Sequence, residues 1–418
     1  MKVLVLGGGG REHALAWRIA QDPQVQKVVL HPGNDGTARA GFASLGDIAL
    51  SSIDMLVAEA HRQMIDLVVV GPEVLLAQGF SDRFRREGFL VVGPGQAGAQ
   101  LETSKAFAKH FLEDGKIPTA HYETASSPAT VREKTGDKYP VVLKLDGLAA
   151  GKGVVVAESE ADREDFINRV WDRKEFGAGP HTVVVEQFLA GRELSYIGLC
   201  DGERFVALST ASDYKRVFDG NLGPNTGGMG AISPSPVANS ELEKRIQEKI
   251  VTPTLKQLKR RGLDYRGALY FGLMICDGEP YVLEFNTRFG DPETQALMLR
   301  LEGNFTDLLC ATAKAELTQA PAPQFKPGAC VYVVAAAAGY PAEPKLGDAI
   351  EGLDAVPAGV QVFFSGVRAS GSKLVTHGGR VMGLGATGPD AEACRRQVYT
   401  AFEKTGWKTM HYRRDIGA

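Results

Sequence analysis

The strongest constraint on the fold is an alternation of short apolar runs with helical segments in the first hundred residues. A helical segment begins near Arg11, directly after the first apolar run. Strands that are buried on both faces and alternate with helices are typical of a parallel sheet covered by helices. We therefore predict an α/β protein with an N-terminal doubly wound domain. The apolar runs are 2–6, 27–30, 65–70 and 89–92.

Glycine-rich and polar loops follow these apolar runs. The crevice beyond the carboxyl ends of parallel strands is the usual place for a ligand. Gly7 and Gly9 fit the start of a dinucleotide-binding fingerprint, but Glu12 occupies its third glycine position and His31, not an acid, follows the second strand. These departures disfavour a nicotinamide cofactor and leave a phosphate or sugar phosphate at the next helix N-terminus as an alternative. The loops are 7–10, 31–34 and 71–73.

Composition sets the class of protein. A chain of 418 residues is long enough for about three domains. The net charge of −3 gives no reason to expect nucleic acid or membrane as a partner. The 5 cysteines form no C-x-x-C pair, which favours reduced thiols, and the N-terminal apolar run is too short for a signal peptide. We expect a cytoplasmic protein with small-molecule ligands.

The segment DGLAAGKGV, residues 146–154, looks like a phosphate-binding P-loop but departs from it. Gly147 and Gly151 enclose three residues, one fewer than the P-loop requires, and Gly153 stands where that motif has Ser or Thr. Apolar, β-branched runs flank the loop on both sides, so a strand–loop–strand hairpin is predicted. The hairpin is either an ordinary flexible turn or a flap that closes over phosphates.

The middle and end of the chain carry further local signals. A helix is expected near 239–261 with a kink at Pro253, and a hairpin is expected to turn at Asp277–Gly278. The last ninety residues predict short strands and one amphipathic helix near 389–404.

The run YVLEFNTR suggests a metal site. On a regular strand Glu284 and Asn286 share one face with Val282, and Leu283 shares the other with Phe285. A carboxylate and an amide oxygen roughly 7 Å apart along a strand suit a hard cation such as Mg²⁺, with phosphates completing the shell. A solvated polar face is the alternative.

The residues that follow suggest an anion site. Asp291 precedes Pro292, a pattern that predicts a helix N-cap with proline at the first helical position. The guanidinium group of Arg288 could bind a carboxylate or a phosphate of a ligand. A surface ion pair is the alternative. Lys144 has apolar neighbours in its strand and needs an anionic partner, which a nucleotide phosphate would supply.

Two other segments suggest ligand contacts. The linker from Glu186 to Glu193 joins two strands, so its backbone could face an adenine and a carboxylate could bind a ribose; a structural crossover is the alternative. The segment 212–230 places Asp213, Lys215 and Asn225 among many glycines, which favours a substrate loop over a disordered one.

Taken in order, these segments resemble the ATP-grasp enzymes and, among them, the glycinamide ribonucleotide synthetases. The likeness covers essentially the whole chain. It implies a Rossmann-like domain at 1–104, a two-lobed ATP-grasp domain at 105–327 with a lid-bearing small lobe at 122–190, and a small β-rich C-terminal domain at 328–418. The motifs are GGGREHALAW, GPE, SKAFAKHFL, DGLAAGKGV, GPNTGGMGA and EFNTRFGDPETQ.

The resemblance implies an activity. These enzymes ligate 5-phosphoribosylamine and glycine with ATP, giving glycinamide ribonucleotide, ADP and phosphate in purine biosynthesis. Lysines and a metal that converge on the distal phosphates favour a glycyl phosphate intermediate. Mg²⁺ or Mn²⁺ is the expected metal, and a monomer is the expected state.

The resemblance also assigns site residues. Many relatives carry a metal-binding acid on the strand before Glu284, but YFGLM has none here, so metal binding would depend on Glu284 and Asn286. Arg288 and Asp213 are the expected catalytic residues. The expected ATP-binding residues are Lys105, Lys144, Gly147, Gly151, Lys152, Gly153, Glu186, Gln187, Phe188, Leu189 and Glu193. The expected substrate-binding residues are Gly9, Arg11, Glu73, Asp213, Lys215, Asn225, Arg288, Asp291 and Glu293.

Three alternatives stay open at this point. A related ATP-grasp ligase could act on another purine intermediate or on bicarbonate, and glycine-dependent ADP formation would separate the two. A nicotinamide-dependent oxidoreductase would reveal itself by NADH binding. A non-catalytic nucleotide-binding protein would bind ATP without forming an amide.

Overall fold

The computed structural model describes residues 1–149 and 152–418, and its N-terminal part is the predicted parallel sheet. The strand order is β2-β1-β3-β4. Val3 and Val5 of β1 pack with α1, whereas Leu4 and Leu6 pack with α3, so helices cover both faces and the doubly wound prediction is confirmed. The elements are β1 (Lys2–Gly7), α1 (Gly10–Ile19), β2 (Lys27–Pro32), α2 (Asp35–Arg39), α3 (Ile53–Gln63), β3 (Leu67–Val70), α4 (Glu73–Ala77), α5 (Phe80–Arg86), β4 (Leu90–Val92) and α6 (Gln96–Thr103).

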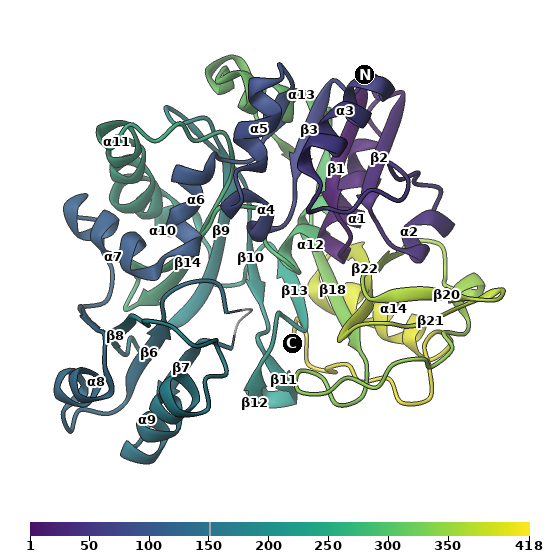
Figure 1. Ribbon diagram of the computed structural model, residues 1–418. Helices are drawn as coiled ribbons and strands as arrows, with labels where there is room; N and C mark the ends of the chain where they lie inside the picture. The colour runs from purple at the N-terminus through teal and green to yellow at the C-terminus, as the bar shows by residue number, and fades with distance from the viewer. Residues whose placement is uncertain (150–151) are drawn as a thin grey trace.

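After α7 (Lys105–Asp114), a small lobe forms a separate sheet in the order β5-β8-β6-β7 (Figure 1). β6 pairs with β7 in antiparallel register, with Lys144 opposite Val154. The glycine-rich segment therefore joins two strands, as predicted, and is not a P-loop. The elements are β5 (Tyr122–Ala125), α8 (Pro128–Thr135), β6 (Val141–Leu145), β7 (Val154–Ala157), α9 (Glu160–Ile167) with a π-helical turn at Asn168–Asp172, and β8 (Val183–Gln187).

A large sheet runs through the rest of the molecule, in the order β15-β14-β9-β10-β13-β18-β22-β19. It continues into the last ninety residues because β13 pairs with β18, with Ala231 opposite Tyr332. Strands on both sides of residue 327 thus belong to one sheet. Its strands are β9 (Arg192–Cys200), β10 (Phe205–Asp213), β13 (Gly230–Ser233), β14 (Gly267–Cys276), β15 (Glu279–Asn286), β18 (Ala329–Ala336), β19 (Val360–Phe364) and β22 (Arg380–Gly388).

The helix expected near 239–261 is present and contains a π-helical turn just before Pro253. α10 (Ser240–Ile246) passes into a π-helical turn at Gln247–Val251 before α11 (Thr252–Arg260). A proline has no N–H to donate and its ring crowds the preceding turn, so the helix widens just before it. The β14–β15 hairpin also turns at Asp277 and Gly278 as expected, and both have positive φ, at 49° and 82°.

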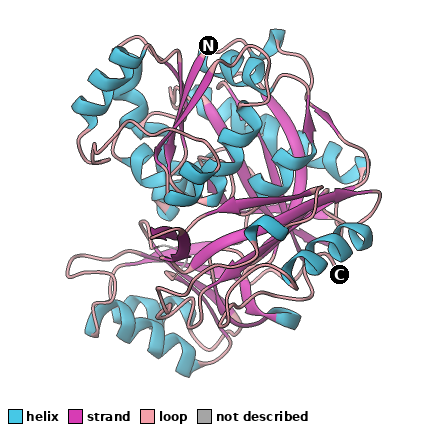
Figure 2. Cartoon of the chain, turned by 90° about the vertical axis from the view of Figure 1, so that its right-hand side faces the viewer, coloured by secondary structure: helices cyan, strands magenta, loops and turns pink. Residues whose placement is uncertain are grey.

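The last ninety residues add short strands and one long helix, as predicted. Cys394, Val398 and Ala401 of α14 (Ala391–Phe402) pack with apolar side chains of β18 and β22, and Figure 2 shows helices lying against the strands. None of the helices in the described part of the chain is long and apolar enough to cross a membrane. The other elements are β11 (Arg216–Phe218), β12 (Leu222–Asn225), α12 (Glu293–Arg300), β16 (Leu301–Glu302), α13 (Phe305–Lys314), β17 (Gln324–Phe325), β20 (Val367–Ser370), β21 (Lys373–Thr376), and 3₁₀ turns at Asp219–Asn221, Leu317–Gln319 and Leu353–Ala355.

Candidate active site

A β-bulge sets the faces of β15. The register passes from Gly272 opposite Glu284 to Leu273 opposite Val282, which leaves Leu283 unpaired. Val282 and Phe285 therefore both pack in the same core cluster. The expectation that Val282 shares a face with Glu284 is wrong, because the extra residue breaks the alternation. Glu284 and Asn286 lie beyond the bulge and are both partly exposed.

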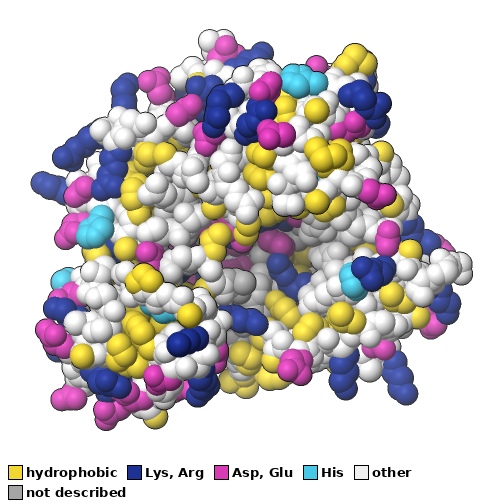
Figure 3. All heavy atoms as spheres, viewed as in Figure 1, with side chains coloured by type: hydrophobic (Ala, Val, Ile, Leu, Met, Phe, Trp, Pro, Cys, Tyr) yellow, Lys and Arg dark blue, Asp and Glu magenta, His cyan; other side chains and the backbone are white. Residues whose placement is uncertain are grey.

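Carboxylates gather around Lys215 at one wall of the site. Lys215 Nζ lies 2.9 Å from the Glu193 carboxylate and 3.9 Å from that of Glu284. The pKa of Asp213 is raised to about 7, chiefly by burial; the charge of Lys215 lowers it, whereas Glu293, Glu193 and Glu284 help to raise it. The wall therefore holds more acid than its lysine neutralises. In the space-filling view, acidic and basic side chains lie in a hollow between the lobes (Figure 3).

The metal site expected at Glu284 and Asn286 has a suitable donor set. Burial raises the pKa of Glu284, but the charges of Lys215, Lys144 and Lys105 outweigh it, so that the pKa is lowered overall. The carboxylate is thus ionised, and its side chain is 42% exposed. Among residues 1–149 and 152–418, no three His, Cys, Asp or Glu side chains are placed to hold a metal ion. Two protein oxygens suit Mg²⁺ only where phosphates or waters complete its shell.

On the opposite wall Lys144 lies in the small lobe and is buried. Its Nζ lies 2.9 Å from Glu186 Oε1 and donates to the Leu283 carbonyl at 2.9 Å. The anionic partner inferred from its apolar neighbours is therefore the carboxylate of Glu186. The other oxygen of Glu186 lies 3.0 Å from Lys109 Nζ. Lys109 was missed by the sequence reading, although it follows Lys105 by one helical turn on α7.

The base of the glycine-rich hairpin is tied to α7. Lys105 Nζ donates to the carbonyl of Gly147 at 2.8 Å, and Gly147 has a φ of 98°, which favours glycine. The carbonyl of Gly153 accepts from the Leu145 N–H at 2.7 Å. Lys152 is exposed, and Gly151 lies outside the described residues.

The linker between β8 and β9 exposes the expected adenine hinge. Gln187 and Phe188 are exposed and Leu189 is half-buried. The Glu193 side chain is 48% exposed and paired with Lys215, so its position suits a contact with a polar ligand. Glu186, by contrast, points away from solvent, with a side chain only 2% exposed.

The N-terminal domain contributes charges beside Arg288. Arg288 lies 2.9 Å from Glu102 and 3.3 Å from Glu73, and Glu73 lies 4.0 Å from Arg11. Burial raises the pKa of Glu73, but Arg288 and Arg11 lower it overall. Although burial lowers the pKa of Arg288, the carboxylates of Glu102 and Glu73 raise it overall. The structure thus brings together Arg11, Glu73 and Arg288, all predicted as substrate residues.

The N-terminus of α1 carries an internal anion. The N–H of Gly9 donates to Glu12 Oε2 at 2.8 Å. A Cβ on Gly7 or Gly71 would overlap the Glu12 side chain, at 2.5 Å and 2.3 Å. The carboxylate of Glu12 therefore lies where a sugar phosphate was considered from the sequence.

Asp291 has a different role from the predicted helix cap. α12 begins at Glu293 without a side-chain cap, so the capping prediction is wrong. The two oxygens of Asp291 accept instead from Arg380 of β22 at 2.7 Å and from Gln295 at 2.8 Å. Arg380 also donates to the Gly227 carbonyl at 2.7 Å. It therefore joins the segment 212–230 to the start of α12. Only the tertiary fold reveals Arg380, since it is distant in sequence.

Two predicted substrate residues differ in their exposure. Glu293 is 3% exposed and accepts from Ser195 Oγ at 3.0 Å. Asn225 is exposed at the end of β12, opposite Arg216. Within the described residues, no hydrogen bond links the Asn225 side chain to the acidic wall.

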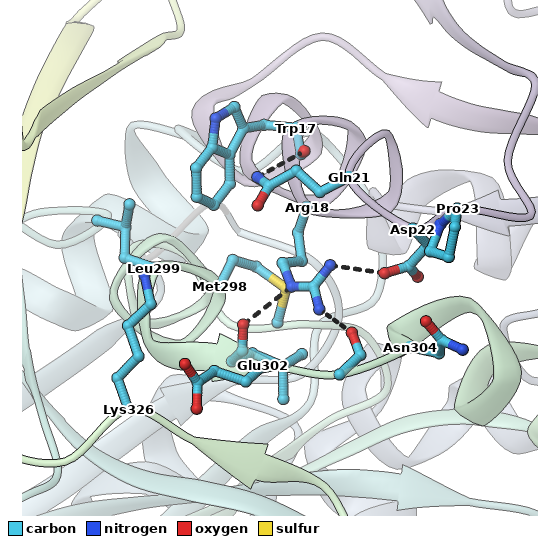
Figure 4. Close-up of a pocket in the computed structure, with 12 residues that line it drawn as sticks. Trp17, Arg18, Gln21, Asp22, Pro23, Met298, Leu299, Glu302, Asn304 and Lys326 are labelled. Atoms are coloured by element: carbon cyan, nitrogen blue, oxygen red, sulfur yellow. Dashed lines mark hydrogen bonds and ion pairs between the residues drawn. The ribbon is translucent and has the colours of Figure 1, made fainter.

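A pocket of about 340 Å³ elsewhere has a structural role (Figure 4). Arg18 on its wall pairs with Asp22 at 2.7 Å and donates to the carbonyls of Leu301, at 3.0 Å, and Gly303. These contacts attach α1 to the segment after α12. The pocket is lined by none of the predicted site residues.

Comparison with known proteins shows which family the chain resembles. Models of phosphoribosylglycinamide synthetase match in their N domain (residues 1–102), ATP-grasp (A) domain (103–294) and C domain (330–418). Phosphoribosylamine–glycine ligases of Xanthomonas axonopodis pv. citri and Vibrio cholerae serotype O1 are 45% and 44% identical to the chain. Each alignment covers 100% of this chain, and 97% and 98% of the respective relatives.

Solved structures give the same result. The crystal structure of phosphoribosylamine–glycine ligase from Thermotoga maritima has a TM-score of 0.84 and 36% identity, covering 99% of this chain and 100% of that one. A biotin carboxylase from Campylobacter jejuni is 16% identical with a TM-score of 0.70, covering 98% of this chain and 92% of that one, and shares the fold alone.

The fold and the two-walled site define an ATP-grasp enzyme. More narrowly, the chain belongs to the phosphoribosylglycinamide synthetase family. It is a ligase that uses ATP and acts on small molecules, which confirms the family predicted from the sequence and sets aside the oxidoreductase alternative.

Proposed function

We propose that this ligase joins 5-phosphoribosylamine to glycine through a glycyl phosphate intermediate, with ADP and phosphate as the other products, in purine biosynthesis. The observation that carries the proposal is the meeting of two walls of opposite charge. Lys105 and Lys144 line one wall, and Glu284 and Asn286 line the other. A nucleotide with its metal ion carries both signs of charge and fits between them.

The proposed nucleotide site follows the small lobe. Phosphates lie against Lys105, Lys144 and the described ends of the hairpin, 147–149 and 152–153, where backbone groups and two ammonium groups offset their charge. The exposed hinge 186–189 offers its backbone to the adenine, and Glu193 offers a carboxylate to the ribose.

Glu284 and Asn286 would hold a Mg²⁺ or Mn²⁺ ion. The ionised carboxylate and the amide oxygen are the donors that such ions prefer, and phosphates supply the rest of the shell. When bound, the ion would neutralise charge that develops on the transferring phosphoryl group.

The proposed reaction has two steps. The carboxylate of glycine, oriented by Arg288, attacks the γ-phosphorus; a C–O–P anhydride forms and ADP leaves. The amine of phosphoribosylamine then attacks the carbonyl carbon; a C–N bond forms and phosphate leaves with the C–O electron pair. Asp213, with a pKa of about 7, is suited to accept the proton released by the amine near neutral pH.

Isotope labelling tests this route. With both carboxylate oxygens of glycine labelled with ¹⁸O, one label per amide is expected in inorganic phosphate. Unlabelled phosphate at full turnover, or label in AMP, would contradict it. ADP formation that needs both glycine and phosphoribosylamine, and that bicarbonate does not support, excludes the related ligases.

The proposal includes a cytoplasmic monomer. The polypeptide mass is 44.8 kDa, so light scattering of the purified protein is expected to give about this value. A mass of twice this value or more would contradict the monomer.

A further inference from the structure

Two lysines share one buried carboxylate in the small lobe. Glu186 Oε2 lies 3.0 Å from Lys109 Nζ, and Oε1 lies 2.9 Å from Lys144 Nζ. The exposed fractions of these side chains are 2% for Glu186, 3% for Lys109 and 8% for Lys144. Buried charges are normally compensated by partners. This cluster instead retains one positive charge that its own members do not neutralise.

Lys109 faces the interior of the lobe. Besides Glu186, it donates to Thr119 Oγ1 at 2.8 Å and lies 3.5 Å from the carbonyl of Ala120. An ammonium group has three N–H donors, so those of Lys109 are all used. The pKa of Lys109 is lowered to about 8, chiefly by burial and against the charge of Glu186, so the ammonium form predominates at neutral pH.

Lys144 faces the cleft. Its Nζ donates to the carbonyl of Leu283 at 2.9 Å, and it lies 2.9 Å from Glu186 Oε1 as an ion pair, with no hydrogen bond to that oxygen within the described residues. It is also one of the charges that lower the pKa of Glu284 on the other wall. The surplus positive charge of the cluster is therefore presented to the cleft by Lys144.

We propose that Lys109 is a positioning residue of the nucleotide site: it neutralises Glu186 and thereby leaves the charge of Lys144 available to the phosphates. The inference rests on the proposed function, since it requires phosphates beside Lys144. Lys109 itself does not touch the nucleotide. Without it, Glu186 and Lys144 form a neutral pair that attracts phosphate less strongly.

The test measures binding of ADP and of adenosine to the full-length chain by calorimetry. Lys109→Met is expected to weaken ADP binding about tenfold, or about 1.4 kcal/mol, and to change adenosine binding less than twofold. Adding Glu186→Gln to this variant removes the competing carboxylate and is expected to restore most of the ADP affinity. Lys134→Met is the matched control, because Lys134 pairs with Glu123 at 3.0 Å on the surface of the same lobe.

The outcomes separate two failures. Wild-type protein that binds neither ligand would refute the nucleotide site of the proposed function. Wild-type protein that binds ADP, with unchanged affinity in Lys109→Met, would refute only the role of Lys109. Equal loss of ADP and adenosine binding, without recovery in the double variant, would show a merely structural role.

A second comparison covers the case in which Lys109→Met does not fold. Glu186→Gln and the double variant both lack the carboxylate, so Lys109 has nothing to neutralise in either. Their ADP affinities are expected to agree within about twofold. A further loss on removal of Lys109 in this background would overturn the proposal.

Discussion

The two walls of the site carry opposite excess charge. On the small lobe, Lys109 and Lys144 share the single carboxylate of Glu186. On the large sheet, several carboxylates, including Glu193 and Glu284, share Lys215. Neither wall neutralises its own charge. The phosphates of a bound nucleotide would supply negative charge to the basic wall, and the metal ion would supply positive charge to the acidic wall.

The largest expected effect comes from the acidic wall. Glu284→Gln keeps the shape of the side chain but removes the proposed metal-binding charge, so turnover is expected to fall at least about 100-fold. The melting temperature is expected to change little, because this side chain is 42% exposed and its ion pair with Lys215 is long, at 3.9 Å. Turnover against magnesium concentration and a melting curve check both. Near-normal activity would remove Glu284 from the metal site.

The basic wall gives the next largest effect. Lys144→Met leaves Glu186 paired with Lys109 and removes the charge that faces the cleft, so ATP binding is expected to weaken about 30-fold. Glycine binding is expected to change much less. Titration of each ligand measures the difference, and an equal effect on both would show that the two walls are not specialised.

A smaller effect concerns stability against pH. The pKa of Asp213 is raised in the folded protein, so the folded state holds the proton more tightly than the unfolded state between pH 4 and 7. Stability of the ligand-free protein therefore falls as pH rises through this window, by about 1 kcal/mol after allowance for solvent in the cleft. Asp213→Asn is expected to remove this slope in urea unfolding. If the free energy of unfolding changes with pH equally in both proteins, the pKa of Asp213 is not raised by folding.

The smallest effect is expected at the hinge. The side chain of Gln187 is exposed, and the proposed adenine contact uses backbone groups. Gln187→Glu is therefore expected to change ATP affinity by less than about twofold. A larger change in a binding titration would mean that the side chain of Gln187 contacts the nucleotide.

Local sequence signals predicted much of the fold. Apolar runs gave the parallel sheet, and residues 146–154 gave a hairpin because both flanks are β-branched. The helical irregularity just before Pro253 and the turn at Asp277–Gly278 follow from the local geometry of single residues, which a sequence shows directly. The sequence also led to the prediction that Glu284, Asn286 and Lys144 belong to the nucleotide and metal site, and this stays a prediction.

Tertiary structure alone decided which face some side chains take and which charged groups pair. The bulge at Leu283 arises from pairing with β14, and it reverses the face of Val282 that strict alternation predicts. Asp291 pairs with Arg380 instead of capping α12.

The same holds for the ion pairs of the small lobe. Lys144 pairs with Glu186 because β6 and β8 are neighbours in its sheet. Sequence determines the type of each side chain and its local backbone, since both depend on near neighbours. The balance of charge at the site depends on strands and helices far apart in the chain, and only their packing fixes it.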